Sequence, residues 1–482
     1  MHDLRPVGYV IGLLCAVFGA TMAVPLAVDF AAGDDHWRAF LQSAVLTSAI
    51  GGLVALACAN SVGDRISLQQ TFLLATGVWM ALPLFGALPF MFGATAARPV
   101  DAVFESMSGL TTTGATVFTG LEHLPRGLLL WRSMLQWFGG IGIIVVAMVF
   151  LPELRVGGMQ IFRSEAFDTG GKVLPRAAEI ASRIGVIYLA LTVANALAYA
   201  AVGMNGFDAI NHALTTMSTG GFATSDASFA PYQGAPEYLA SVFMVIASLP
   251  FVRYVQIVAG AARPLLRDTQ VRAFLWTIAA LVSVITAYRV LANGDHWEHA
   301  FREALFNVIS VITGTGFASV DYQLWGPFPV MMFFFVGLIG GCAGSTTCSV
   351  KIFRYQLLIA SIKVQIRRIH SPHGQFAPRY EGRVVSDEVM SSVMSFFGVF
   401  VVSLGLIAVA LSMTGLDFVT SISGAATAIA NVGPGLGDTI GPAGNFAAIN
   451  DTAKWILSAA MLLGRLELLI VFVLFMPRFW RA

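Results

Sequence analysis

The chain has 482 residues, of which 57% are hydrophobic and only 11% are charged, whereas a soluble domain carries roughly a quarter charged residues. Its mean hydropathy is +0.76, which excludes an ordinary soluble protein and indicates an all-α polytopic membrane protein. The formal net charge of +1 says nothing about partners.

Apolar runs follow one another along the whole chain, and we count about ten that reach the roughly 20 residues a spanning helix needs. The first run continues without a polar break through Ala-Val-Pro-Leu-Ala and is followed by a second span. We therefore interpret it as a retained helix and not as a secretory signal. Runs of this kind include 7–30, 72–92, 184–202, 274–291, 389–413 and 455–476.

Basic residues cluster after Pro152, after Ala262, in residues 351–383 and at the C-terminus. By the positive-inside rule these four segments are cytoplasmic, and the basic-poor connections around Asp101, Asp208 and Asp417 lie outside. Nucleic-acid binding is an alternative explanation of the 351–383 run. A cytoplasmic loop of a protein in a lipid bilayer explains the same charges, so we expect no nucleic-acid partner.

Signals of covalent or hydrolytic chemistry are weak in this sequence. The four cysteines are too dispersed for a disulfide framework or a metal site. His296 and His299 fit an interfacial helix start, and no G-x-S-x-G, H-E-x-x-H or P-loop occurs. A membrane enzyme acting on a lipid or polyprenyl substrate would need a carboxylate or His cluster at the cytoplasmic boundary, and we find no convincing one. We predict that the protein is not an enzyme and has no covalent cofactor.

Glycine-rich polar stretches interrupt the apolar chain at four places, each between two spanning runs. They read SGLTTTGATVF, TTMSTGGFATSDASF, VITGTGFASVDY and IANVGPGLGD. When Gly114, Gly221, Gly316 and Gly433 are aligned, the spacings between them are 107, 95 and 117 residues. Such a period indicates four copies of one unit.

The pattern of a short helix precedes each aligned glycine. Thirteen residues upstream stand Asp101, Asp208, Glu303 and Thr420, each followed by a small residue and an aliphatic one. We interpret these four as caps of a half-helix that ends at the glycine loop. The unit is therefore span, half-helix, loop, span, and all four units point the same way.

Irregular backbone at membrane depth is tolerated only where protein buries it or where it lines a water-filled cavity. Four related loops most simply meet at one axis, where their carbonyls and Thr hydroxyls can replace the hydration shell of a cation. The half-helices would direct their partially negative C-termini at that ion, which favours a monovalent cation over an anion. The alternative for any one loop is a helix contact built from small residues.

The motifs TTTGAT, STGGF, TGTGF and NVGPG, with GGCAGST in the third unit and LGRLELL in the last helix, make the chain similar to the Trk/Ktr/HKT superfamily of potassium transporters. Within it the chain resembles the TrkH-like pore-forming subunit of the bacterial Trk system over nearly its whole length. The resemblance implies four pseudo-symmetric M1-P-M2 repeats around one central pore, plus two extra N-terminal transmembrane helices. The corresponding segments are 1–66 for these two helices and 67–154, 155–264, 265–370 and 371–482 for the repeats.

The resemblance further implies potassium uptake across the bacterial inner membrane, with potassium bound at a selectivity filter. The four filter strands are chemically unequal, because Asn431 and Val432 replace threonines and Pro434 stiffens the fourth. This inequality should weaken selectivity, so that some sodium can pass. Rubidium is expected to act as an analogue of potassium. The implied filter residues are Thr111, Thr112, Thr113, Gly114, Ser218, Thr219, Gly220, Gly221, Thr313, Gly314, Thr315, Gly316, Asn431, Val432 and Gly433.

A glycine cluster breaks the second helix of the third unit, and a break beside the filter can act as a gate. The resemblance implies that this is an intramembrane loop that obstructs the pore. Arg465 lies within the last apolar run, where an arginine faces a cavity or a partner, and we expect it to face the pore. Close helix packing and snorkelling to the interface are the respective alternatives. The gate residues are Gly337, Gly340, Gly341, Gly344, Ser345, Thr346, Thr347 and Arg465.

Two partners are implied by the resemblance: a second copy of the chain in a homodimer, and a cytoplasmic TrkA-like ring of nucleotide-binding regulatory subunits. The ring would dock on the loops at 153–183, 263–272 and 351–388. A potassium carrier coupled to protons or sodium is the alternative to a channel-like transporter. Coupling usually needs ionisable residues at membrane depth, and apart from Arg465 the spans offer few.

Overall fold

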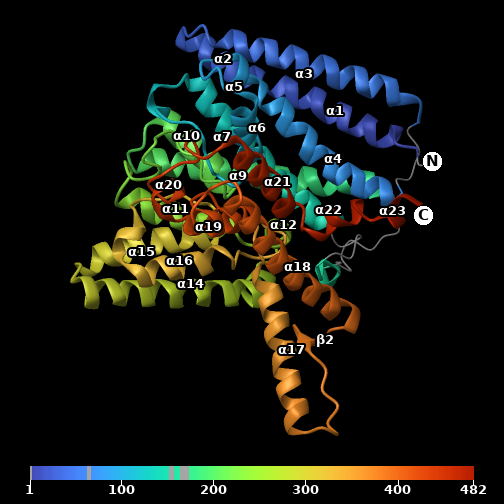
Figure 1. Ribbon diagram of the computed structural model, residues 1–482, viewed down its shortest axis with the longest axis vertical. Helices are drawn as coiled ribbons and strands as arrows, with labels where there is room; N and C mark the ends of the chain where they lie inside the picture. Colours follow the sequence, from blue (N-terminus) through green and yellow to red (C-terminus); the bar gives the residue numbers. More distant parts are fainter. Residues whose placement is uncertain (1–2, 62–66, 151–156, 163–172, 482) are drawn as a thin grey trace.

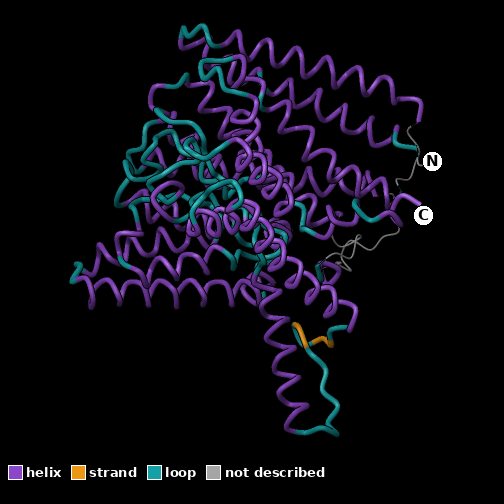
Figure 2. The backbone as a smooth tube through the Cα atoms, viewed as in Figure 1, coloured by secondary structure: helices purple, strands orange, loops and turns teal. Residues whose placement is uncertain are grey.

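The computed structural model describes residues 3–61, 67–150, 157–162 and 173–481. In these ranges the chain is mostly helical, and many of its loops gather in the interior of the body (Figure 2). The predicted boundaries after residues 66 and 154, and much of the predicted docking loop 153–183, lie outside the described residues.

Three N-terminal helices form a layer along one side of the body, next to α4 (Figure 1). They are α1 (Arg5–Thr21), α2 (Ala23–Ala32) and α3 (Trp37–Cys58). Glycines bring α1 and α3 together, since a Cβ added to Gly12 would lie 2.6 Å from the Ala55 nitrogen and one on Gly51 would lie 2.5 Å from the Ala16 nitrogen. Because α1 and α2 together form one span, this layer supplies the two extra N-terminal transmembrane helices that were predicted.

Four units of span, short helix, irregular strand and span follow, which is the predicted M1-P-M2 order. The short pore helices are almost wholly buried, as α6 and α15 illustrate. The first helices are α4 (Leu68–Gly86, continued by α5, Leu88–Phe92), α9 (Val173–Ala201), α14 (Thr269–Tyr288) and α18 (Asp387–Ser412). The pore helices are α6 (Pro99–Leu110), α10 (Gly206–Met217), α15 (Trp297–Ile312) and α19 (Phe418–Ala430).

The second, inner helices of the units differ in how they continue past the pore helices. In the first unit α7 (Arg126–Val145) runs into a π-helical turn (Val146–Phe150). In the others the helix is divided: α11 (Ala235–Ala247) and α12 (Phe251–Val258), α16 (Pro327–Gly337) and α17 (Ile352–His370), and α21 (Asp451–Arg465) and α22 (Leu469–Leu474). Short α-helices that the structure also describes are α13 (Arg263–Arg267), α20 (Gly437–Ile440) and α23 (Pro477–Arg481).

These divisions correct two expectations from the sequence. The run 455–476 is not one continuous helix, because α21 ends at Arg465 and α22 begins at Leu469. Seven helices among the described residues are long and apolar enough to cross a membrane, and the α11–α12 pair, bent by 89°, makes an eighth. The count of about ten is reached only if the divided inner helices of the third and fourth units are included.

The predicted helix caps were also wrong in position. The residues that precede the pore helices are Arg98, Asn205, His296 and Asp417, of which Asn205 and Asp417 accept a hydrogen bond from the first turn. Asp101, Asp208 and Thr420 lie inside the first turn, and Glu303 lies two turns into α15. The helices begin earlier than predicted because an acidic or hydroxyl residue suits the first turn as well as the cap.

Helix α17 extends away from the body and carries a small hairpin beside it (Figure 1). The hairpin pairs β1 (Arg379–Tyr380) antiparallel with β2 (Arg383–Val384). Basic residues Arg367, Arg368 and His370 lie in the last turn of α17, where they complement the helix dipole. This projection belongs to a segment predicted to be cytoplasmic.

Candidate functional site

All four pore helices end in the same backbone turn. The second residue after each of the first three pore helices is left-handed, with φ of 53° at Thr112, 51° at Thr219 and 75° at Gly314. After α19 the left-handed residue is the first one, Asn431, with φ of 53°. In each case its N–H bonds to the carbonyl three residues back, at 2.9, 3.0, 3.1 and 3.3 Å. This is one bond of the Schellman motif, which satisfies carbonyls at a helix C-terminus.

The second Schellman bond is present in three of the four turns. Thr113, Gly220 and Val432 donate to the carbonyl five residues back, at 2.9, 2.9 and 3.0 Å. In the third unit Gly316 donates to the Ser310 carbonyl instead, at 3.1 Å. The pseudo-fourfold symmetry inferred from glycine spacing thus extends to individual hydrogen bonds, with one local departure.

The four strands after these helices form a closed ring. A Cβ on Gly114 would lie 2.2 Å from the Gly220 oxygen, and one on Gly221 would lie 1.9 Å from the Thr315 oxygen. A Cβ on Gly316 would lie 2.8 Å from the Gly433 nitrogen, and one on Gly433 would lie 3.0 Å from the Gly114 oxygen. Each glycine therefore meets the strand of the next unit, and the fourth meets the first.

Hydroxyl groups in the predicted filter stabilise the strands through hydrogen bonds. The Thr111 and Thr113 hydroxyls are 2.8 Å apart, and those of Thr313 and Thr315 are 2.7 Å apart. Asn431 Nδ2 donates to Thr113 Oγ1 at 3.0 Å, which joins the fourth strand to the first. The hydroxyl set therefore contributes to the rigidity of the ring.

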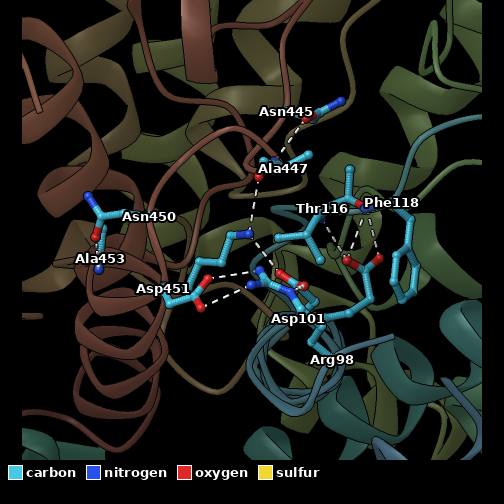
Figure 3. Close-up of polar contacts among 12 residues, drawn as sticks. Arg98, Asp101, Thr116, Phe118, Asn445, Ala447, Asn450, Asp451 and Ala453 are labelled. Carbon is cyan, nitrogen blue, oxygen red and sulfur yellow. Dashed lines mark hydrogen bonds and ion pairs between the residues drawn. The ribbon is translucent and has the colours of Figure 1, made fainter. Parts of the chain in front are cut away.

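Ion pairs join the first and last units at the N-terminal ends of α6 and α21 (Figure 3). Arg98 contacts Asp451 at 2.8 Å, and Lys454 Nζ contacts Asp101 Oδ1 at 2.7 Å.

A cavity of about 260 Å³ opens on the glycines of all four strands and on the residues that follow them. The ring therefore has an aqueous approach from this side.

The residues between α16 and α17 form a loop that touches the other units. Phe251 N donates to the Gly344 carbonyl at 2.9 Å, and Cys342 N donates to the Ser248 carbonyl at 3.1 Å. Thr219 Oγ1, in the strand that follows α10, donates to Thr346 Oγ1 at 3.1 Å. Since Thr219 precedes Gly221 and the cavity is lined by Gly221 and residues after it, the loop lies on the opposite side of the ring.

The predicted gate residues all belong to this region. Gly337 ends α16, and Gly340 and Gly344 have φ of 78° and 72° within the loop. A Cβ on Gly341 would lie 2.7 Å from the Thr347 hydroxyl, and that hydroxyl is 2.7 Å from Ser345 Oγ. The loop is thus held by its own hydrogen bonds as well as by its neighbours.

Arg465 is buried against the loop and does not snorkel to an interface. Its Nη2 donates to the Gly139 carbonyl of α7 at 2.8 Å, and its Nη1 donates to the Thr346 carbonyl at 3.4 Å and to the Cys348 sulfur. One guanidinium therefore connects the last unit, the loop of the third unit and the inner helix of the first.

Comparisons with known proteins agree with this architecture. The TrkH family, described as cation transport proteins, matches residues 36–482. This chain belongs to the TrkH family. It is 42% identical to the Trk system potassium uptake protein TrkI of Halomonas elongata, over 99% of this chain and 97% of that protein. It is 36% identical to the Trk system potassium uptake protein TrkH of Escherichia coli K12, over 100% of both.

The TrkH-family fold is matched by a solved structure as well. The crystal structure of the potassium transporter TrkH from Vibrio parahaemolyticus superposes with a TM-score of 0.92 at 33% identity, over 100% of both chains. Three predictions are confirmed: the family, a multi-pass helical membrane protein, and a transporter instead of an enzyme.

Buried charges in this TrkH-family chain are more numerous than the sequence suggested. Glu105 pairs with Arg132 at 2.8 Å, and Glu303 pairs with Arg289 at 2.7 Å, each with both side chains almost fully buried. The expectation was that the spans offer few ionisable residues apart from Arg465. Two arginines in the spans were overlooked, because Arg132 lies in α7 and Arg289 near the end of the run 274–291; their partners Glu105 and Glu303 lie in the pore helices α6 and α15.

Two further sets of residues were missed. Lys351 and Arg354 of the loop and α17 bind Glu467, which lies in the break of the last helix. Gln136 of α7 contacts the strand that follows α10, at Gly220 and Phe222. A single glutamine in an apolar run carries no signal, but Glu467 was visible as a carboxylate beside an arginine at membrane depth.

Proposed function

We propose that this TrkH-family chain takes up potassium across the bacterial inner membrane. The observation that carries the proposal is the closed ring, in which each filter glycine meets the strand of the next unit. Two relatives that the chain matches over 97% and 100% of their lengths are named potassium uptake proteins. A ring at membrane depth with a cavity on one face fits an ion pathway, because irregular backbone there must line one or be buried.

In this proposal a dehydrated potassium ion binds along the axis of the ring. Backbone carbonyls, assisted by Thr hydroxyls, replace its water. The four pore helices end at the strands, so their partially negative C-termini stabilise the cation. The proposed ligands come from the ranges Thr111–Gly114, Ser218–Gly221, Thr313–Gly316 and Asn431–Gly433.

The loop between α16 and α17, together with Arg465, is the proposed gate. The loop crosses the side of the ring away from the cavity, and Arg465 adds a positive charge there. A cation leaving the filter would meet both a steric and an electrostatic barrier. Opening requires the loop to leave its contacts with Ala247, Ser248 and Phe251.

The proposal includes two partners, a regulatory ring and a second copy of the chain. The projecting α17 and its hairpin give a cytoplasmic surface suited to a TrkA-like nucleotide-binding ring, and we also propose a homodimer. The segments 67–154, 155–264, 265–370 and 371–482 remain the proposed repeats.

The test is cation flux into liposomes that hold the purified chain. Potassium, rubidium, sodium and lithium are compared for the wild type and for Gly316→Ser. Gly316 has φ of 81°, and a Cβ there would lie 2.8 Å from the Gly433 nitrogen. We expect potassium and rubidium to pass ahead of sodium, and the substitution to erode that preference.

Gly294→Ser is the matched control. Gly294 has a similar φ of 75°, but a Cβ there would meet nothing within 4 Å. This variant should keep the wild-type preference. Flux that requires a proton or sodium gradient would instead favour the coupled carrier, and equal behaviour of the two glycine variants would contradict the filter assignment.

A further inference from the structure

Gln136 of α7 makes two hydrogen bonds to the backbone of the second filter strand. Its Nε2 donates to the Gly220 carbonyl at 2.6 Å, and its Oε1 accepts from Phe222 N at 3.0 Å. The side chain is completely buried. One amide therefore holds the peptide groups on both sides of Gly221, and it comes from the neighbouring unit.

Gln136 explains why position 220 is a glycine. The φ of Gly220 is outside the left-handed region, so the backbone conformation does not require glycine. A Cβ on Gly220 would lie 2.4 Å from Gln136 Cδ and Oε1. The equivalent residues in the other strands are Thr113, Thr315 and Val432, which all carry side chains. Gln136 occupies the volume that such a side chain would fill.

This contact makes the four carbonyls at that level of the ring unequal. Of the four, in the part of the chain that the structure describes, only that of Gly220 accepts a hydrogen bond from a side chain. A carbonyl has two lone pairs, so one remains for an ion while the other fixes its direction. The second strand is thereby restrained where glycine would otherwise leave it free to rotate.

We propose that Gln136 is a positioning residue that sets potassium over sodium selectivity by fixing the Gly220 carbonyl. The inference rests on the proposed function, because it needs a selective filter to act upon. A fixed carbonyl keeps the spacing that suits the larger ion. A carbonyl that rotates freely can close around sodium, so loss of the restraint should admit sodium.

Gln136→Met tests this proposal, because methionine keeps the length and volume and removes both hydrogen bonds. We expect the potassium-to-sodium permeability ratio, from reversal potentials of the purified chain in planar bilayers, to fall about two- to tenfold, the factor that one buried hydrogen bond represents.

Ser133→Ala is the matched control on the same helix. Its hydroxyl donates to Asn211 Oδ1 of α10 at 2.8 Å and touches the pore helix instead of the filter strand. This variant should keep the wild-type ratio. A fall equal to that of Gln136→Met would assign the effect to general packing and overturn the proposal.

A second pair of variants covers the case in which Gln136→Met does not fold. Gly220→Ala should lower the midpoint of thermal unfolding, and adding Gln136→Ala should restore the midpoint but leave the ratio low. Wild-type selectivity in the double variant, or in a folded Gln136→Met, overturns the inference alone. A wild type without potassium preference overturns the proposed function and the inference together.

Discussion

At the scale of single residues, Arg465 combines a structural and an electrostatic role. Its guanidinium holds Thr346 of the loop and Gly139 of α7 at once. Arg465→Gln removes the charge and most of these bonds. We expect potassium flux in liposomes to rise about tenfold, which corresponds to a barrier lower by about 1.4 kcal/mol.

Arg465→Lys separates the two roles, since lysine keeps the charge but lacks the planar fork. Flux in this variant should stay near the wild-type value if the charge is the main barrier. Unchanged flux in Arg465→Gln would contradict a role for this residue in the barrier.

The proposed filter residues were predicted from the sequence because four glycines recur in register. Their conformations could not be predicted. Thr112 and Thr219 are β-branched residues in the left-handed region, which only tertiary contacts make tolerable. Nor could the contact between Gln136 and Gly220 be foreseen, because it joins residues of two units that only the folded ring brings together.

At the scale of secondary structure elements, the break in the last helix depends on one buried carboxylate. Glu467 has φ of 59° and binds Lys351 at 3.3 Å and also Arg354. Glu467→Gln leaves two buried cations without their counter-charge, which should cost about 3–5 kcal/mol. The expected result is a clearly lower midpoint of thermal unfolding for the purified protein.

Asp35→Asn serves as the control for this prediction. The Asp35 side chain is 84% exposed and pairs with Arg38 at 3.2 Å, and such surface pairs contribute about 0–1 kcal/mol. Its midpoint should stay close to that of the wild type. Equal midpoints for Glu467→Gln and the wild type would mean that the break does not depend on the ion pairs.

The position of this break could not be predicted from the sequence, whereas two other helix interruptions could. The interruption after Gly337 was predictable because glycines weaken a helix, and Pro250 was a visible signal for the bend between α11 and α12. Gly464 precedes the end of α21, but no proline or glycine lies between Arg465 and Leu469. The last helix breaks there because long-range charges stabilise a conformation that local propensity opposes.

At the scale of the whole molecule, the ring must be closed between units that are far apart in sequence. The first and last units meet through Asp101 with Lys454 and through Arg98 with Asp451 (Figure 3). Fourfold repetition predicted that these units would be neighbours. It did not predict the ion pairs, because Arg98, Asp451 and Lys454 have no counterparts in the glycine register.

Asp101 makes this closure dependent on pH. Burial disfavours its ionised form, but the Lys454 ammonium and the Arg98 guanidinium outweigh burial and hold its pKa below the ordinary value. A carboxyl with a depressed folded-state pKa stabilises the fold above its unfolded pKa of about 3.9 and loses that contribution as the pH falls through the folded value. Asp101→Asn should therefore lower the unfolding midpoint at pH 7, by the equivalent of about 3 kcal/mol, because it leaves Lys454 buried and unpaired.

The deficit of Asp101→Asn should shrink as the pH falls below about 4, because the wild type then loses the same charge. Thermal unfolding of both proteins between pH 3 and pH 7 measures this difference directly, and acid effects common to all carboxylates cancel in it. Exposed Asp438→Asn, in α20, should match the wild type throughout the range. A deficit that stays constant down to pH 3 would show that Asp101 acts through packing, and the closure of the ring would then not depend on its charge.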